Sequence, residues 1–357
     1  MPKRIGNLYD SIISMENLRL AESKARKGKT DTYGVRLFDR NREENLERLH
    51  EQLLTHTYKT SPYSLFTIQE PKERLIYRLP YYPDRIVHHA IMNILEPIWV
   101  KVFPYNTYSC IKDRGIDGAR RRVMSILKDP EQSRYCLKID IRKFYPSIRH
   151  DVAKRIIRRK IKCRPTLALI DEIIDSVNGC PDPINPDNVC DGWSLPIGNY
   201  LSQFIANLVL SYLLHKVNTF PGIKAVLYAD DGTFFAKDKE TLHRLLAFLK
   251  DELQRDLGLT LKDNYQIFPV AKNKEDRHGR GVDFVGFVFY HEQTQIRKSI
   301  KKHFAKKVNR LNRRDPLLPV SEYKQAIAPW LGWAKYSNSK HLLQTLINKD
   351  EYKSILQ

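Results

Sequence analysis

Two adjacent aspartates interrupt a run of apolar residues between positions 224 and 236, and this arrangement constrains the fold more than any other feature. Residues 224–229 and 232–236 each have the composition of a β-strand, and Asp230 and Asp231 stand between them. Strands joined by so short a connection form a hairpin, which predicts that both carboxylates lie at its tip. An Asp pair at a tight turn is common as turn chemistry alone, so the dipeptide needs support from the rest of the sequence.

The residues that precede the hairpin supply that support. Residues 135–141 are expected to form a strand whose apolar side chains face one way, while Lys138 and Asp140 face the other. The segment Leu195-Pro196-Ile197-Gly198 leads into a helix, and the leucine pattern of residues 239–257 predicts another. A strand, helices, a hairpin and a final helix in this order, around a mixed sheet, are typical of a polymerase palm.

The rest of the chain is expected to be mainly helical. Apolar periodicity predicts helices over residues 7–28, 41–56, 83–100, 150–162 and 299–357. An extended segment is expected over 63–80, and short strands over 265–270 and 282–290. No window is apolar enough to span a bilayer, and no apolar segment follows the basic N-terminus, so neither a membrane anchor nor a signal peptide is expected.

The charge balance points to a polyanionic partner, with a merely basic protein as the simpler alternative. The chain has 61 Lys and Arg against 41 Asp and Glu, a formal net charge of +20. Residues 149–164 hold eight basic residues and one acidic residue, and residues 297–314 hold nine basic residues and none acidic. Two such runs favour contact with a phosphate backbone over two solvated faces. The nucleic-acid-binding side chains expected in the second run are Lys301, Lys302, Lys306 and Arg310.

Candidate metal ligands are carboxylates rather than cysteines. The five cysteines form no CxxC pair, so neither a zinc site nor a disulfide framework is expected. We expect the protein to work in a reducing cytoplasm. Nucleotidyl transfer uses two divalent cations about 3.5 to 4 Å apart. Mg²⁺ demands hard oxygen ligands, which Asp140, Asp230 and Asp231 supply. We therefore expect two Mg²⁺ ions, with Mn²⁺ as the alternative ion.

Three segments in order give the chain a resemblance to the reverse transcriptases, over roughly residues 45–340. They are Lys138-Ile139-Asp140-Ile141-Arg142-Lys143-Phe144-Tyr145, Leu195-Pro196-Ile197-Gly198-Asn199-Tyr200-Leu201-Ser202-Gln203 and Tyr228-Ala229-Asp230-Asp231. The resemblance implies an RNA-directed DNA polymerase whose partners are template RNA, primer or nascent cDNA, and dNTPs. It also implies that Asp140 and Asp230 bind both metal ions with help from the Ile141 carbonyl, and that Asp231 is a nearby ligand.

The same resemblance implies an α+β right-hand polymerase with fingers, palm and thumb. The palm would carry an RRM-like antiparallel or mixed sheet, and the thumb would be helical. The expected divisions are an N-terminal helical extension at 1–60, fingers at 61–134, a palm at 135–290 with a fingers element at 150–195, and a thumb at 291–357.

Several residues are expected to contact the incoming nucleotide. The family places a bulky ring at the position of Tyr145, under the sugar, where it selects deoxynucleotides; a core aromatic is the alternative. Lys72, Arg74 and Arg78 lie on the extended segment, and the two arginines are expected at the triphosphate because guanidinium groups match phosphate oxygens. A solvated strand face is the alternative for them. The full set of expected dNTP-binding residues is Arg74, Arg78, Tyr145, Ile197, Gly198 and Gln203.

The residues around Gly198 narrow the resemblance to the enzymes of diversity-generating retroelements. The pattern Ile-Gly-Asn-x-x-Ser-Gln at 197–203 is similar to theirs, as are residues 84–90 and a primer-grip hairpin at 282–287 that would bring Gly286 to nucleic acid. That subtype implies mutagenic retrohoming with errors at adenines, a small pentameric accessory protein and a cytoplasmic location in a bacterial or phage-infected cell. Many reverse transcriptases have Gln at the position of Ile197, whose side chain offers only bulk. We therefore expect this enzyme to discriminate less strictly between correct and incorrect base pairs. The alternative is that Ile197 only packs against its neighbours.

Two other functions stay open. Ser202-Gln203 also occurs in some phage-defence reverse transcriptases, and a catalytically inactive nucleic-acid-binding scaffold is the second alternative. His88 and His89 are expected to make structural hydrogen bonds, because adjacent helical residues do not share one face. Lys262 is the candidate acid for pyrophosphate, since the Lys usual in polymerases is replaced near Gln266.

Overall fold

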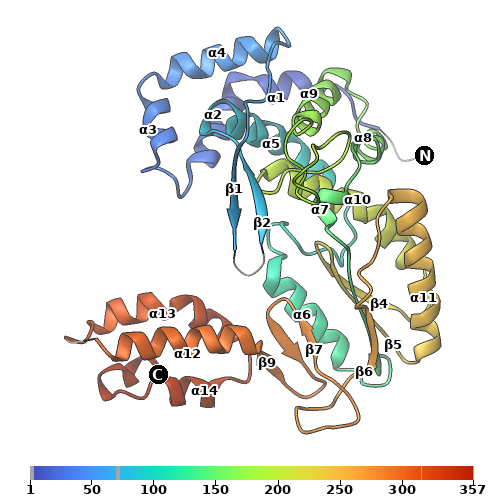
Figure 1. The fold of residues 1–357 in the computed structure, drawn as a ribbon, viewed down its shortest axis with the longest axis vertical. Helices are drawn as coiled ribbons and strands as arrows, with labels where there is room; N and C mark the ends of the chain where they lie inside the picture. The colour runs from blue at the N-terminus through green and yellow to red at the C-terminus, as the bar shows by residue number, and fades with distance from the viewer. Residues whose placement is uncertain (1–3, 70–72, 315, 357) are drawn as a thin grey trace. The chain divides into compact units, whose positions relative to one another are not determined.

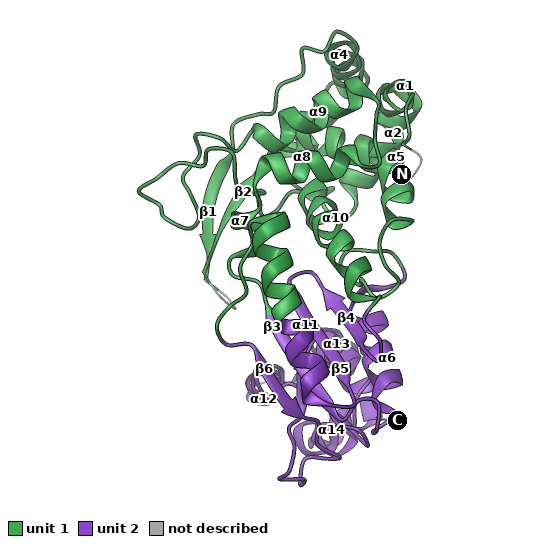
Figure 2. Cartoon of the chain, turned by 90° about the vertical axis from the view of Figure 1, so that its right-hand side faces the viewer, with its two compact units in different colours: residues 1–112, 140–219, 247–263 green, residues 113–139, 220–246, 264–357 purple. Residues whose placement is uncertain are grey.

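The protein is described by a computed structural model that covers residues 4–69, 73–314 and 316–356. The chain divides into two compact units, each assembled from segments that are far apart in the sequence (Figure 2). Unit 1 comprises residues 1–112, 140–219 and 247–263, and unit 2 comprises residues 113–139, 220–246 and 264–357. Within the described ranges, no helix is both long and apolar enough to cross a membrane.

Unit 1 is mainly helical and is organised around α5 (Ile86–Val100), which packs against α2 (Met15–Arg26) and α10 (Tyr200–Val217) (Figure 1). Both α5 and α10 bury side chains on most of their circumference, which is typical of helices in the centre of a domain. An antiparallel hairpin, β1 (Ser64–Ile68) and β2 (Arg74–Arg78), extends from these helices. The other helical elements of unit 1 are α1 (Tyr9–Ile13), α3 (Tyr33–Asp39), α4 (Arg42–Leu54), η1 (Tyr81–Arg85), α7 (Phe144–Ser147), α8 (His150–Arg158), α9 (Arg164–Asp175) and η2 (Leu253–Leu257).

The predicted N-terminal helix is divided in two. Ser14 has an extended backbone and separates α1 from α2, and its hydroxyl accepts a hydrogen bond from the Asn17 amide at 3.2 Å. A serine in this position caps the second helix, so the side chain that ends α1 also begins α2. The helix α3 was not predicted, and it buries Val35 and Phe38.

Unit 2 contains the predicted hairpin and the sheet to which it belongs. The hairpin consists of β4 (Lys224–Tyr228) and β5 (Asp231–Ala236), and it joins β3 (Tyr135–Asp140) and β6 (Gln266–Pro269) in the order β4-β5-β3-β6. The strand predicted at 135–141 and the hairpin are therefore confirmed. The helix α6 (Gly115–Leu127) packs against β4 and was not predicted, whereas the predicted helix at 239–257 is present as α11 (Lys239–Glu252) followed by η2.

The C-terminal part of unit 2 has its own core. A three-stranded sheet of β7 (Val282–Phe284), β8 (Phe287–Phe289) and β9 (Thr294–Ile296) leads into α12 (Lys298–Asn312), α13 (Val320–Lys335), α14 (Lys340–Leu346) and η3 (Asp350–Leu356) (Figure 1). The apolar face of α12 contributes to this core, because Phe304, Val308 and Leu311 are buried. Trp330 stacks on Phe304 with ring centres 5.8 Å apart, so this tryptophan belongs to the core.

Gly286 lies in the turn between β7 and β8, and the structure leaves no room for a side chain there. Its φ is +87°, and an added Cβ would lie 2.5 Å from the Trp333 ring. We expect Gly286→Ala to lower the free energy of unfolding by at least about 2 kcal/mol, since it combines a strained backbone with overpacking. Denaturant unfolding followed by tryptophan fluorescence measures the change.

Gly332, in α13, provides the control for this substitution. A Cβ added there would meet no atom within 4 Å. Gly332→Ala should therefore stabilise the protein by about 0.5–1 kcal/mol, because alanine favours the helix. Equal effects of the two substitutions would contradict the packing described for Gly286.

Candidate active site

Asp140 is held by the backbone on both of its sides. The Lys262 amide donates to the Asp140 carbonyl at 2.9 Å, and the Arg142 amide donates to the Thr260 carbonyl at 2.8 Å. Ile141 forms the antiparallel bridge to Leu261 between these two bonds, and its side chain is buried. The end of β3 is therefore fixed before any ligand binds, which is what a metal or substrate site requires.

The two carboxylate oxygens of Asp140 have different surroundings. Oδ2 accepts a hydrogen bond from the Lys262 ammonium at 2.5 Å. Oδ1 is buried and has no hydrogen-bond partner among the described residues. The buried Oδ1, which lacks a donor, is therefore the oxygen of Asp140 that fits a hard divalent ion.

No three His, Cys, Asp or Glu side chains form a ready metal cluster within the part of the chain that the structure describes. Such a cluster is not required for nucleotidyl transfer. Mg²⁺ in polymerases takes one or two carboxylates from the protein and completes its octahedron with water and substrate phosphate.

Asp230 and Asp231 lie at the turn between β4 and β5, as predicted. Ala229 enters the turn with a φ of +53°, and Asp231 pairs with Tyr228 across the hairpin. The Asp231 carboxylate is about one-third exposed and lies 3.9 Å from the Lys138 ammonium. Lys138 stands two residues before Asp140 in the sequence. The start of β5 therefore lies beside the C-terminal part of β3 within unit 2.

Gly232 allows this approach, and the sequence analysis missed it. A Cβ at this position would lie 2.9 Å from the Leu227 side chain and 3.0 Å from that of Ile139. Glycine therefore leaves the Leu227, Ile139 and Phe234 side chains uncrowded in this packing. The sequence feature that could have identified Gly232 is its position directly after the Asp pair, at the start of a predicted strand.

The turn that carries Tyr145 is tied to the segment before α10. Lys143 adopts a left-handed conformation with φ +42° and starts α7. The Leu195 amide donates to the Tyr145 carbonyl at 2.9 Å, and the half-buried Tyr145 ring meets the buried Phe144 ring edge-on. The structure thus brings Tyr145 and the Ile197–Gly198 segment into one neighbourhood of unit 1.

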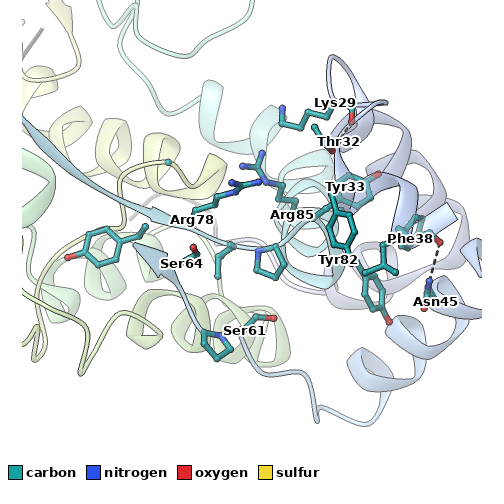
Figure 3. Close-up of a pocket in the computed structure, with 18 of the residues that line it drawn as sticks. Lys29, Thr32, Tyr33, Phe38, Asn45, Ser61, Ser64, Arg78, Tyr82 and Arg85 are labelled. Atoms are coloured by element: carbon teal, nitrogen blue, oxygen red, sulfur yellow. Dashed lines mark hydrogen bonds between the residues drawn. The ribbon is translucent and has the colours of Figure 1, made fainter. Parts of the chain in front are cut away.

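The Ile197–Gly198 segment in turn contacts β2. The Tyr77 amide donates to the Ile197 carbonyl at 3.1 Å, and a Cβ on Gly198 would lie 3.3 Å from the Ile76 side chain. Gly198 and Arg78 line a cavity of about 1040 Å³ (Figure 3), and Gly198 and Gln203 line a second cavity of about 210 Å³. Arg74 is exposed and does not line either cavity, and Lys72 lies outside the described residues.

The residues predicted to track nucleic acid differ in their accessibility. Lys302, Lys306 and Arg310 are exposed on α12, whereas Lys301 is half-buried, and burial together with Lys274 lowers its pKa. Gly286 is buried beneath Trp333, and its carbonyl accepts a hydrogen bond from the Arg297 amide.

Three of the eight basic residues in the run at 149–164 form ion pairs within unit 1. Lys154 bonds to Asp175 at 2.5 Å, Arg158 pairs with Asp171, and Arg149 pairs with Asp151 at 2.9 Å. Fewer of these charges are left for a phosphate backbone than the sequence run indicates.

His88 and His89 do not share the structural role expected for them. Structural hydrogen bonds were expected for both histidines; His88 is 2% exposed, and its Nε2 has no hydrogen-bond partner among the described residues. Burial lowers the pKa of His88 to about 3, with further contributions from His89 and Arg85. His89 stacks on Tyr200 with ring centres 4.8 Å apart, and burial lowers its pKa to about 4.

Protein YkfC of Escherichia coli strain K12 is 25% identical over 169 residues, which are 46% of this chain and 43% of YkfC. The chain therefore matches less than half the length of that relative.

The fold is similar to that of telomerase from Candida albicans, solved in complex with a TWJ fragment of telomeric RNA. The TM-score is 0.51 at 11% identity, over 85% of this chain and 66% of that chain. Apo telomerase from Candida tropicalis gives a TM-score of 0.48 at 11% identity, over 71% of this chain and 53% of that chain. The first likeness shows the α+β right-hand polymerase fold expected from the sequence.

Residues 68–287 match the family described as reverse transcriptase (RNA-dependent DNA polymerase). This match covers more than half of the chain, and the chain therefore belongs to the reverse transcriptase family.

Proposed function

We propose that the chain is an RNA-directed DNA polymerase that copies a template RNA into cDNA from dNTPs. Asp140, Asp230 and Asp231, with the Ile141 carbonyl, are its proposed ligands for two Mg²⁺ ions, for which Mn²⁺ can substitute. The observation that carries the proposal is the Asp140 carboxylate at the end of β3, with one oxygen buried without a donor and the other neutralised by Lys262. Membership of the reverse transcriptase family also supports the proposed polymerase activity.

When bound, the two cations would activate the 3′-hydroxyl of the primer and neutralise the triphosphate. The chain's own residues position the reactants. Tyr145 is proposed to exclude a 2′-hydroxyl, and Gly198 lets the nucleotide approach the backbone because it carries no side chain. Arg74 and Arg78, at the two ends of β2, are proposed to bind the triphosphate.

The finer proposal is a diversity-generating retroelement enzyme that copies adenines inaccurately, in the cytoplasm, with a small pentameric accessory protein. It is supported by the Ile-Gly-Asn-x-x-Ser-Gln pattern at 197–203. The half-buried Ile197 side chain has no hydrogen-bonding group to offer a base pair, while its carbonyl is engaged by Tyr77. A template repeat and a variable target gene beside the coding sequence would distinguish this enzyme from a phage-defence reverse transcriptase.

Asp230→Asn should abolish polymerisation, because it removes a charged metal ligand while keeping the side-chain shape. We expect Mg²⁺-dependent dNTP incorporation on a primed RNA template to fall roughly a thousandfold or more. Asp187→Asn, in an exposed loop, is the matched control and should retain wild-type activity. Incorporation at the wild-type level by the Asp230 variant would refute the assignment of this active site, and no incorporation by either protein would leave the inactive scaffold as the function.

Ile197→Gln should make copying more accurate. An added amide can hydrogen-bond beside the nucleotide, and one such bond supplies roughly fivefold discrimination. Sequencing of cDNA from the wild type and the variant measures errors at template adenines. Ile116→Gln, at an exposed position on α6, is the control because it introduces the same amide at a residue outside the predicted nucleotide site. An unchanged adenine error rate in Ile197→Gln would leave packing as the role of this residue.

Lys262→Gln should tighten binding of a divalent cation in the absence of nucleotide. The ammonium of Lys262 competes with a metal ion for Asp140 Oδ2, and both side chains are about one-third exposed, so the competition is partly screened. We expect the Kd for Mn²⁺, measured by calorimetry, to fall about two- to fivefold. Lys237→Gln, at an exposed position, should leave it unchanged. A weaker affinity in Lys262→Gln would show that Lys262 supports the metal site instead of competing with it.

A further inference from the structure

The Lys138 side chain connects three strands. Lys138 belongs to β3, and its ammonium donates a hydrogen bond to the backbone carbonyl of Asp283, in β7. The same ammonium lies 3.9 Å from Oδ1 of Asp231, the first residue of β5. All three residues belong to unit 2, which is purple in Figure 2. The side chain therefore links the hairpin that carries the Asp pair to a strand that is distant in the sequence.

The β7 end of this link is fixed by the backbone and by an ion pair. Asp283 lies opposite Val288 in the antiparallel pairing of β7 with β8, which sets the position of its main chain. Its carboxylate accepts a hydrogen bond from Arg297 Nε at 2.6 Å and lies 2.5 Å from Arg297 Nη2. Arg297 therefore neutralises the carboxylate of Asp283, and Lys138 binds the carbonyl of this residue.

Asp231 is the acidic partner that remains for the Lys138 charge among the ion pairs of the described residues. The side chains of Lys138 and Asp231 are 26% and 33% exposed, so water screens their attraction only in part. An ammonium that is bound to a fixed carbonyl cannot move freely with the carboxylate. Its attraction therefore favours one position of Asp231 at the start of β5.

Lys262 makes a different contact with the other strand end. Its ammonium donates directly to Asp140 Oδ2 at 2.5 Å, and a cation at that oxygen would have to displace it. Lys138 lies beyond hydrogen-bond distance of Asp231 Oδ1, and its hydrogen bond is made to β7 instead. A cation that binds Asp231 would therefore leave the bond between Lys138 and β7 in place.

We propose that Lys138 is a positioning residue for polymerisation, which acts by holding the Asp231 carboxylate in place from β7. This inference rests on the proposed function, in which Asp231 is a metal ligand. Lys138 has no contact with the reacting atoms in this role. Because a misplacement of about 1 Å in a reacting group can lower the rate about a hundredfold, the loss of such a residue lowers kcat more than it changes substrate binding.

Lys138→Met removes the ammonium and keeps a long unbranched side chain. We expect kcat on a primed RNA template to fall about tenfold or more, while KM for dNTP changes less than about twofold. KM is expected to hold because the residues proposed to bind dNTP belong to unit 1. Lys138→Arg keeps a cation that can donate to the same carbonyl, and it should recover most of the lost kcat.

Lys224→Met is the matched control. It makes the same substitution at an exposed position of the same hairpin, where Lys224 lies opposite Phe235 at the end away from the Asp pair. Its kcat should stay within about twofold of the wild type, as for a surface substitution. A wild-type kcat in Lys138→Met, or an equal loss in Lys138→Met and Lys138→Arg, would overturn the positioning role.

Hydrogen exchange of the metal-free protein, followed by mass spectrometry, gives a measurement that does not depend on activity. Lys138→Met should raise the amide exchange rates of residues 228–232 roughly several-fold, because the tip of the hairpin loses its link to β7. The buried residues Phe234 and Phe235 should exchange as in the wild type. An equal increase throughout unit 2 would show that Lys138 only stabilises the fold, and would overturn the inference.

Asp230→Asn separates the failure of this inference from the failure of the proposed function. If Asp230→Asn abolishes incorporation and Lys138→Met keeps the wild-type kcat, the positioning role is refuted and the active site stands. If Asp230→Asn incorporates dNTP at the wild-type level, the proposed active site is refuted, and the role of Lys138 in it is refuted as well.

Discussion

The approach of β5 to β3 at Gly232 is the contact on which the candidate site depends. A side chain there would crowd Leu227 and Ile139, so glycine favours the close packing of β5, the strand that follows the Asp pair, against β3. Ile139 immediately precedes Asp140, whose backbone is fixed by hydrogen bonds on either side of Leu261. The carboxylates are thus attached to strands whose positions are set by close packing and by the backbone, and rigid supports of this kind preorganise a site.

The excess positive charge of the chain is distributed in two different ways. On α8 the basic residues pair with Asp171 and Asp175, and there they connect helices. Around the cavities of unit 1, Arg78 and Arg85 have no acidic partner among the described residues. Net charge counts paired and unpaired side chains equally, but a cation keeps a strong field for a ligand only where no acidic partner neutralises it.

Local patterns predicted much of the fold. The hairpin around Asp230 and the strand that contains Asp140 were both expected, because each depends on the alternation of nearby residues. The break at Ser14 and the helices α3 and α6 were missed. In α6 the apolar positions Ala119, Val123 and Ile126 have helical spacing, but three consecutive arginines obscured it.

The sequence by itself determined the ordered set of aspartates, the turn residues around them and the family resemblance, since each of these depends on short segments of consecutive residues. It could not determine which of 61 basic residues are paired, because the acidic partners come from distant segments. It also could not show that His88 is buried with an unsatisfied nitrogen, or that Lys262 contacts Asp140 across more than a hundred residues. Burial and long-range pairing are decided by the tertiary structure, because only the folded chain excludes water and brings distant charges together.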